Sequence, residues 1–162
     1  MIKLLGTIDN QLILQAYQQL EKDIEWQNYY HDGKQAGLQF HNSHNEWGSI
    51  ESKNPPDSSF NILNPFFKDT YFEKVITEYD LFRTRLIWLG SNTCYWFHKD
   101  RFARVHIPII TNEHSYFIFK TGLIKHLPIG SVYLVDTRLE HTAINGAATP
   151  RLHLVGSVAN YT

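Results

Sequence analysis

Three residues of this sequence, His98, Asp100 and His141, have the types and spacing needed to hold a metal ion. Residues two apart on a strand point to the same side, so His98 and Asp100 can project together from a strand end. His141 lies 43 residues further on, which leaves room for about three strands before the second imidazole returns beside the first. Two imidazoles and one carboxylate form a facial triad, which binds Fe(II) on one side and leaves other positions open.

The His-x-Asp pair alone is weak evidence, because the chain has nine histidines. His44 and Glu46 form a rival pair with equivalent ligand types, in a loop-rich stretch without a later histidine at a comparable strand position. The alternative to metal binding is that all three residues have no shared role. Each would then be an ordinary polar residue, either exposed to solvent or hydrogen-bonded within the core.

Arg151 is a second candidate for chemistry. It lies among Leu152, Leu154 and Val155 along an apolar segment, and a buried arginine requires an anionic partner. That partner is either a bound anion or, in a purely structural role, Asp136 or Glu140. His153 lies on the same face as Arg151, where packing or support of the site is the favoured role.

Short β segments must position these residues. Seven of them follow residue 81, rich in β-branched and aromatic residues and without an intervening helix: 83–89, 93–98, 103–110, 115–120, 131–136, 140–144 and 151–158. Such a run indicates a sandwich or barrel. The first half predicts helices over 10–22 and 66–79 and short strands over 36–41 and 46–51. Four aromatic residues of the second half are predicted to be core: Trp88, Trp96, Phe97 and Phe117.

Length and composition limit the alternatives. A chain of 162 residues with 43% hydrophobic residues is expected to form one domain over 1–162, with helices, lid and flanking strands in 1–80 and the β core in 81–162. The net charge of -1 argues against nucleic-acid or membrane partners. A lone cysteine excludes a disulfide scaffold and a cysteine zinc site. Without a signal peptide or membrane span in the sequence, a cytoplasmic protein is expected.

Four segments in this order resemble the aspartyl/asparaginyl β-hydroxylase family of Fe(II)/2-oxoglutarate-dependent oxygenases, to which some bacterial proline cis-hydroxylases are also similar. They are 98–110 (HKDRFARVHIPII), 130–136 (GSVYLVD), 141–145 (HTAIN) and 151–155 (RLHLV). The resemblance covers roughly residues 83–158. It implies a mainly β fold, the double-stranded β-helix of jelly-roll and cupin-like proteins, with the N-terminal helices packed on its outside.

The resemblance also implies a role for each site residue. His98, Asp100 and His141 would hold Fe(II), and Arg151 would pair with the distal carboxylate of 2-oxoglutarate. Arg104 and His106 match the family's Arg-x-His position near the co-substrate's other carboxylate. A purely structural role is equally open, because their alternation with apolar residues is also typical of a half-buried strand. Phe102 stands where the peptide hydroxylases have an arginine for their substrate.

The expected activity is that of a dioxygenase that uses Fe(II), 2-oxoglutarate and O2 to hydroxylate a C–H bond of a free amino acid or small molecule, with succinate and CO2 as products. One alternative in the same class is a peptidyl Asp/Asn β-hydroxylase. Two others are a non-catalytic β-helix protein that binds a small anion and a cupin-like metalloenzyme that does not use 2-oxoglutarate.

Overall fold

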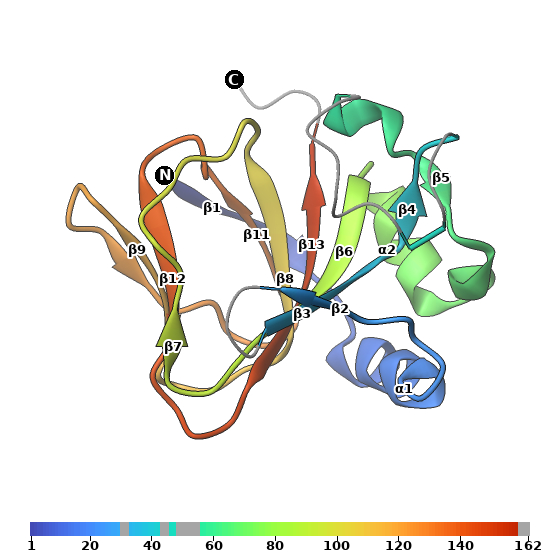
Figure 1. Cartoon of the computed structure of the whole chain (residues 1–162), viewed down its shortest axis with the longest axis horizontal. Helices are drawn as coiled ribbons and strands as arrows, with labels where there is room; N and C mark the ends of the chain where they lie inside the picture. The colour runs from blue at the N-terminus through green and yellow to red at the C-terminus, as the bar shows by residue number, and fades with distance from the viewer. Residues whose placement is uncertain (30–32, 43–45, 48–55, 159–162) are drawn as a thin grey trace.

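The structure of the protein is a computed structural model that describes residues 1–29, 33–42, 46–47 and 56–158 (Figure 1). Its helices are α1 (Asn10–Leu20), η1 (Asp57–Ser59), η2 (Pro65–Phe67) and α2 (Tyr71–Glu78). Its strands are β1 (Ile2–Thr7), β2 (Gln27–Tyr29), β3 (Gly33–Gly37), β4 (Gln39–Phe40), β5 (Ile62–Leu63), β6 (Phe82–Leu89), β7 (Thr93–Cys94), β8 (Arg104–Ile110), β9 (Ser115–Phe119), β10 (Ile124–Lys125), β11 (Ser131–Val135), β12 (His141–Asn145) and β13 (Arg151–Ser157). No helix in the described ranges is long and apolar enough to cross a membrane.

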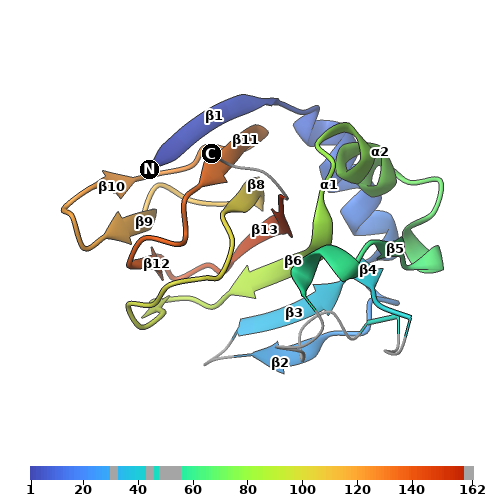
Figure 2. The same ribbon diagram turned by 90° about the horizontal axis from the view of Figure 1, so that it is seen from above.

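Two antiparallel sheets form the body of the fold. The larger sheet has seven described strands in the order β1-β11-β8-β13-β6-β3-β2, and the smaller has four in the order β10-β9-β12-β7. Figure 2 shows the larger sheet curving around from β1 to β2, with β9 and β12 beside it. The mainly β fold class, a double-stranded β-helix with helices outside, is thereby confirmed.

The two central strands of the larger sheet bury both of their faces. Val105 and Ile107 of β8, with Leu152 and Leu154 of β13, belong to the core cluster that includes the buried side of the helices. The alternate residues of these strands face the smaller sheet, because side chains alternate along a strand. One face of the sheet therefore serves folding, and the other is available for a site.

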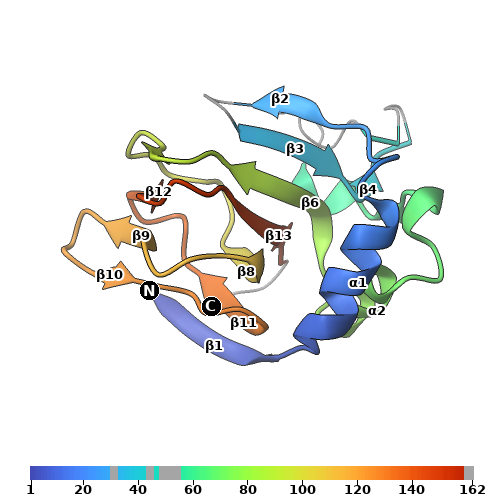
Figure 3. The same cartoon turned by 90° about the horizontal axis from the view of Figure 1, so that it is seen from below.

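The helices lie against the outer face of the larger sheet (Figure 3). The Asp9 carboxylate caps α1 by accepting from the backbone N–H groups of Gln11 and Leu12 at 2.9 and 3.1 Å. The helix then buries Ile13, Ala16 and Tyr17, while α2 buries Phe72, Val75 and Ile76.

Three predicted elements differ from the structure. The helix predicted over 66–79 begins only at Tyr71, because Asp69 has a left-handed φ of 59° that separates η2 from α2. The strand predicted over 93–98 ends at Cys94. Residues 46–47 form a turn instead of the predicted strand over 46–51, whose other residues lie outside the described ranges.

The early end of β7 also overturns two predicted core residues. Trp96 is 76% exposed and Phe97 is 50% exposed. Both follow the point where the chain leaves the smaller sheet, so no second layer covers them. The chain returns to the sheet only at His98, through a single antiparallel bridge to His141.

Candidate metal centre and its cavity

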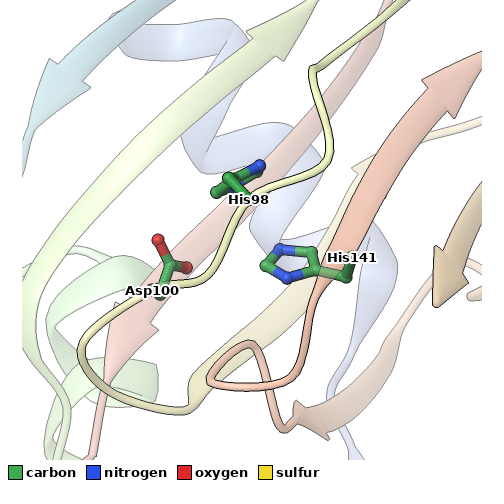
Figure 4. A group of neighbouring side chains, drawn as sticks. All are labelled: His98, Asp100 and His141. Carbon is green, nitrogen blue, oxygen red and sulfur yellow. The ribbon is translucent and has the colours of Figure 1, made fainter. Parts of the chain in front are cut away.

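The structure brings together His98, Asp100 and His141. One potential ligand atom from each lies within 4.8 Å of the others, and Figure 4 shows His141 facing the segment that carries His98 and Asp100. Backbone hydrogen bonds hold the two segments: His98 N donates to His141 O at 2.9 Å, and His141 N donates to His98 O at 3.0 Å. Asp100 N donates to Thr137 O at 2.8 Å. His98 and Asp100 thus lie on an extended segment that is not a regular strand and that has one β-bridge, from His98 to His141.

Both imidazoles are oriented by the backbone. Nδ1 of His98 lies 2.8 Å from Trp96 O, and Nδ1 of His141 lies 3.0 Å from Leu139 O. A carbonyl oxygen only accepts, so Nδ1 carries the proton in each ring. The neutral rings then keep a lone pair on Nε2, which is the form that binds a metal.

A cavity of about 390 Å³ opens at this group. Alternate residues of β6, β8, β12 and β13, with Phe117 of β9 and Gln35 of β3, form most of its wall. The cavity thus lies between the two sheets, on the face of the larger sheet opposite the helices. Sites for small molecules typically have roughly this size, about 300–1,000 Å³.

Arg151, His106 and His153 form a buried group in this cavity, with 5%, 8% and 3% exposure. Arg151 Nη1 lies 2.8 Å from His153 Nδ1, and its guanidinium carbon lies 5.7 Å from the centre of the Phe117 ring. Arg151 Nε and His106 Nδ1 are buried without a hydrogen-bond partner in the described part of the chain. An unsatisfied N–H of the Arg151 guanidinium and an unsatisfied imidazole nitrogen in the same cavity fit a bound anion.

The structural alternative for Arg151 is contradicted. Asp136 pairs with Arg138 at 2.7 Å, and Glu140 pairs with Lys120 at 2.9 Å. None of the ion pairs among the described residues involves Arg151. The guanidinium is thus available to a ligand.

Burial sets the charges of this group. Burial, followed by the nearby Arg151 charge, lowers the pKa of His106 and that of His153 well below 6.5. Burial also lowers the pKa of His141 below 6.5 and that of Arg151 to about 10. At neutral pH His106, His141 and His153 are therefore neutral, whereas Arg151 is charged.

These shifts predict a loss of stability in acid. The unfolded chain protonates its histidines near pH 6.5, whereas folded His106 and His153 stay neutral, so the unfolded state gains protons as the pH falls. The free energy of unfolding of the metal-free protein should decrease below pH 6.5, by up to about 1.4 kcal/mol per pH unit for each histidine. Urea unfolding between pH 7.5 and 5.5 tests this, and His106→Gln should reduce the slope. A flat profile in the parent protein would contradict it.

Arg104 joins the cavity to a buried carboxylate, Asp57, that the sequence pattern does not indicate. Its Nε donates to Asp100 Oδ2 at 3.3 Å, and its Nη1 donates to Asp57 Oδ2 at 3.0 Å. Asp57 stands at the start of η1, is 4% exposed, and also pairs with Arg83 and accepts from Ser157. No local pattern marks Asp57, because its partners come from distant strands. The co-substrate role implied for Arg104 and His106 stays a prediction.

Only one residue of the rival pair, Glu46, belongs to the described part of the structure. His44 lies outside the described ranges, and Glu46 occupies a turn. Among the described residues, His98, Asp100 and His141 are the group whose ligand atoms lie close enough to share a metal ion. The donor set fits Fe(II), since two imidazoles and one carboxylate lie beside open cavity space.

The fold and the site define a double-stranded β-helix protein with a candidate facial triad and a cavity lined by the buried Arg151. The chain belongs to the aspartyl/asparaginyl beta-hydroxylase family, whose sequence model matches residues 9–160.

Two further proteins are similar to it. The L-proline cis-4-hydroxylase of Rhizobium meliloti (strain 1021) is 29% identical over 107 residues, which cover 62% of this chain and 36% of that relative. The chain therefore spans little more than a third of that relative's length. The crystal structure of an oxidoreductase of the 2OG-Fe(II) oxygenase family from Burkholderia pseudomallei has a TM-score of 0.59 at 13% identity, covering 88% of this chain and 75% of that one. This second likeness supports the fold.

Proposed function

We propose that the protein is an Fe(II)/2-oxoglutarate-dependent oxygenase that hydroxylates a C–H bond of a free amino acid or a similar small molecule. The observation that carries the proposal is the candidate triad in the same cavity as Arg151, a buried cation without a carboxylate partner in the described structure. Family membership and the proline hydroxylase relative support the same class.

In this proposal His98, Asp100 and His141 hold the metal, and Arg151 receives the distal carboxylate of 2-oxoglutarate through charge-assisted hydrogen bonds. Fe(II) bound there would supply the activation of O2, of which one atom enters the substrate as hydroxyl and the other enters succinate as CO2 leaves. The neutral states of His106 and His153 allow them to donate or accept hydrogen bonds without adding charge beside Arg151.

The apolar part of the cavity excludes water from the reacting groups. Leu89, Phe117 and Val155 line it together with the polar residues, and all three are almost fully buried. A dry wall strengthens the electrostatic interactions of the bound anion and protects reactive species from side reactions.

A third arginine of the cavity, in addition to Arg104 and Arg151, supports a substrate that carries its own carboxylate. Arg85 lines the cavity from β6, and its Nη1 donates to the Oε1 of buried Gln35 at 3.1 Å. In the proposal Arg85 binds the α-carboxylate of a free amino acid, a group that is absent from the interior of a peptide. A guanidinium suits this role because its planar fork of N–H donors can bind a carboxylate through two parallel hydrogen bonds.

Arg85→Gln should therefore raise the KM for an amino-acid substrate about tenfold or more while leaving the KM for 2-oxoglutarate nearly unchanged, because one charge-assisted hydrogen bond is worth about 1.5–3 kcal/mol. Succinate release measured against each concentration separates the two constants. Equal rises in both KM values would contradict the assignment of Arg85 to the substrate.

The first test of the function is an anaerobic titration of Fe(II) into the purified protein with 2-oxoglutarate. The expected result is a visible metal-to-ligand charge-transfer band that requires both additions and is absent in His98→Ala. Succinate release with a panel of free amino acids and of Asp- or Asn-containing peptides then defines the substrate class.

Each other outcome favours a different function. Iron binding without the band would favour a cupin-like metalloenzyme, and the absence of iron binding would favour a protein that binds an anion through Arg151. Turnover of the peptides alone would move the proposal to a peptidyl Asp/Asn β-hydroxylase.

A further inference from the structure

The buried pair of Asp57 and Arg104 lies directly behind the candidate metal ligand Asp100. The side chains of Asp57 and Arg104 are 5% and 9% exposed, whereas that of Asp100 is 26% exposed toward the cavity. Arg104 Nη1 donates to Asp57 Oδ2 at 3.0 Å, and Arg104 Nε donates to Asp100 Oδ2 at 3.3 Å. One guanidinium therefore bridges a fully buried carboxylate and a carboxylate at the site.

Asp57 is itself fixed from several sides. Ser157 Oγ of β13 donates to its Oδ2 at 3.0 Å, and Arg83 of β6 pairs with its Oδ1. Burial alone would raise the pKa of Asp57, but the Arg104 and Arg83 guanidinium groups offset this and hold the pKa below its usual value. Asp57 is thus a charged anchor joined to three strands of the larger sheet.

We propose that Asp57 is a positioning residue for the metal site, acting through Arg104 to hold Asp100 Oδ2 so that Oδ1 is left for the metal. The inference rests on the proposed function in one respect, the assignment of Asp100 as a ligand. The physical reason is orientation: outer partners of ligating carboxylates fix their geometry, and their loss typically lowers metal affinity by about 10–100-fold.

Asp100 needs such a contact for its orientation because it does not lie on a regular strand. Its backbone N–H donates to Thr137 O, but the residues on either side belong to no strand. Arg104 begins β8, which pairs with both β11 and β13. The bridge from Arg104 thus connects a ligand on a loop to a strand that is paired on both of its edges.

Three single variants test the inference by Co(II) binding, measured calorimetrically and by visible absorption without turnover. Asp57→Asn should lower Co(II) affinity about tenfold or more. Arg104→Lys should do the same with the fold intact, because an ammonium can pair with Asp57 but lacks the planar fork needed to bridge both carboxylates. Arg83→Gln is the matched control: it removes the charged partner of Asp57 Oδ1 and leaves the bridge from Asp57 Oδ2 through Arg104 to Asp100, so stability should fall while Co(II) affinity is retained.

A double-mutant cycle separates positioning from a general structural effect. In an Asp100→Ala background, Asp57→Asn should cause no further loss of Co(II) affinity, because the residue through which it acts is gone. Equal losses in the two backgrounds, or a loss in Arg83→Gln equal to that in Asp57→Asn, would overturn the positioning role. A parent protein that binds neither Co(II) nor Fe(II) would instead overturn the proposed function, and the inference with it.

Discussion

Fe(II) affinity is expected to fall by about 100-fold or more, and hydroxylation to disappear, when His141 is replaced by alanine. The expected magnitude exceeds that for loss of an outer partner, which already costs about 10–100-fold, because a metal ligand itself is removed. The neutral imidazole of His141, with Nδ1 held by Leu139 O, has no counterpart in the alanine side chain. Anaerobic calorimetry with Fe(II) and succinate release provide the two measurements.

Two companion variants guard against a folding artefact. His141 is 3% exposed and its ring stacks on Phe117, so alanine also leaves a void, whereas His98 is exposed and its removal costs little packing. His98→Ala should therefore lose iron while keeping the unfolding midpoint of the parent. His114→Ala, at an exposed histidine outside the cavity, should retain parental iron affinity. Parental affinity in both His98→Ala and His141→Ala would remove these residues from the site.

The second large effect is expected for Arg151. Arg151→Ala should raise the KM for 2-oxoglutarate at least tenfold and leave Fe(II) affinity nearly unchanged, because the guanidinium contacts His153 and Phe117 and none of the three candidate ligands. The lost charge-assisted hydrogen bonds are worth about 1.5–3 kcal/mol, which corresponds to roughly 10- to 150-fold in affinity. Succinate release at varied 2-oxoglutarate, with calorimetry for iron, checks both parts. An unchanged KM would refute the assignment.

Replacing Arg151 should also change stability and co-substrate binding in opposite directions. A cation buried without an anionic partner destabilises the protein without its ligand, as the lowering of the pKa of Arg151 to about 10 by burial indicates. Arg151→Met, which keeps an unbranched side chain, should therefore raise the unfolding midpoint of the free protein while impairing co-substrate binding. Arg138→Met removes an arginine from a more exposed ion pair with Asp136 and should not raise it.

Much of the fold follows from local patterns. The strands around Val105, Leu134 and Leu154 occur where β-branched and aromatic residues alternate or run together, and α1 begins at Asn10 as predicted. The pattern fails to predict the start of α2, because Asp69 has a left-handed φ that does not fit a helix, and α2 begins only at Tyr71. It fails also at Trp96, where an aromatic segment that resembles a strand leaves the sheet and is exposed.

The sequence by itself determined the residue types of the site: the candidate ligands His98, Asp100 and His141, and an arginine on a core strand that needs an anion. Only the tertiary structure decided that Arg151 has no structural carboxylate partner among the described residues and that Asp57 stands behind Asp100. The reason is physical. Periodicity reports which way a side chain points within its own strand, whereas the bonds from Asp57 to Arg104 and to Ser157 join residues 47 and 100 positions apart. Such pairings exist only once the strands have assembled into sheets.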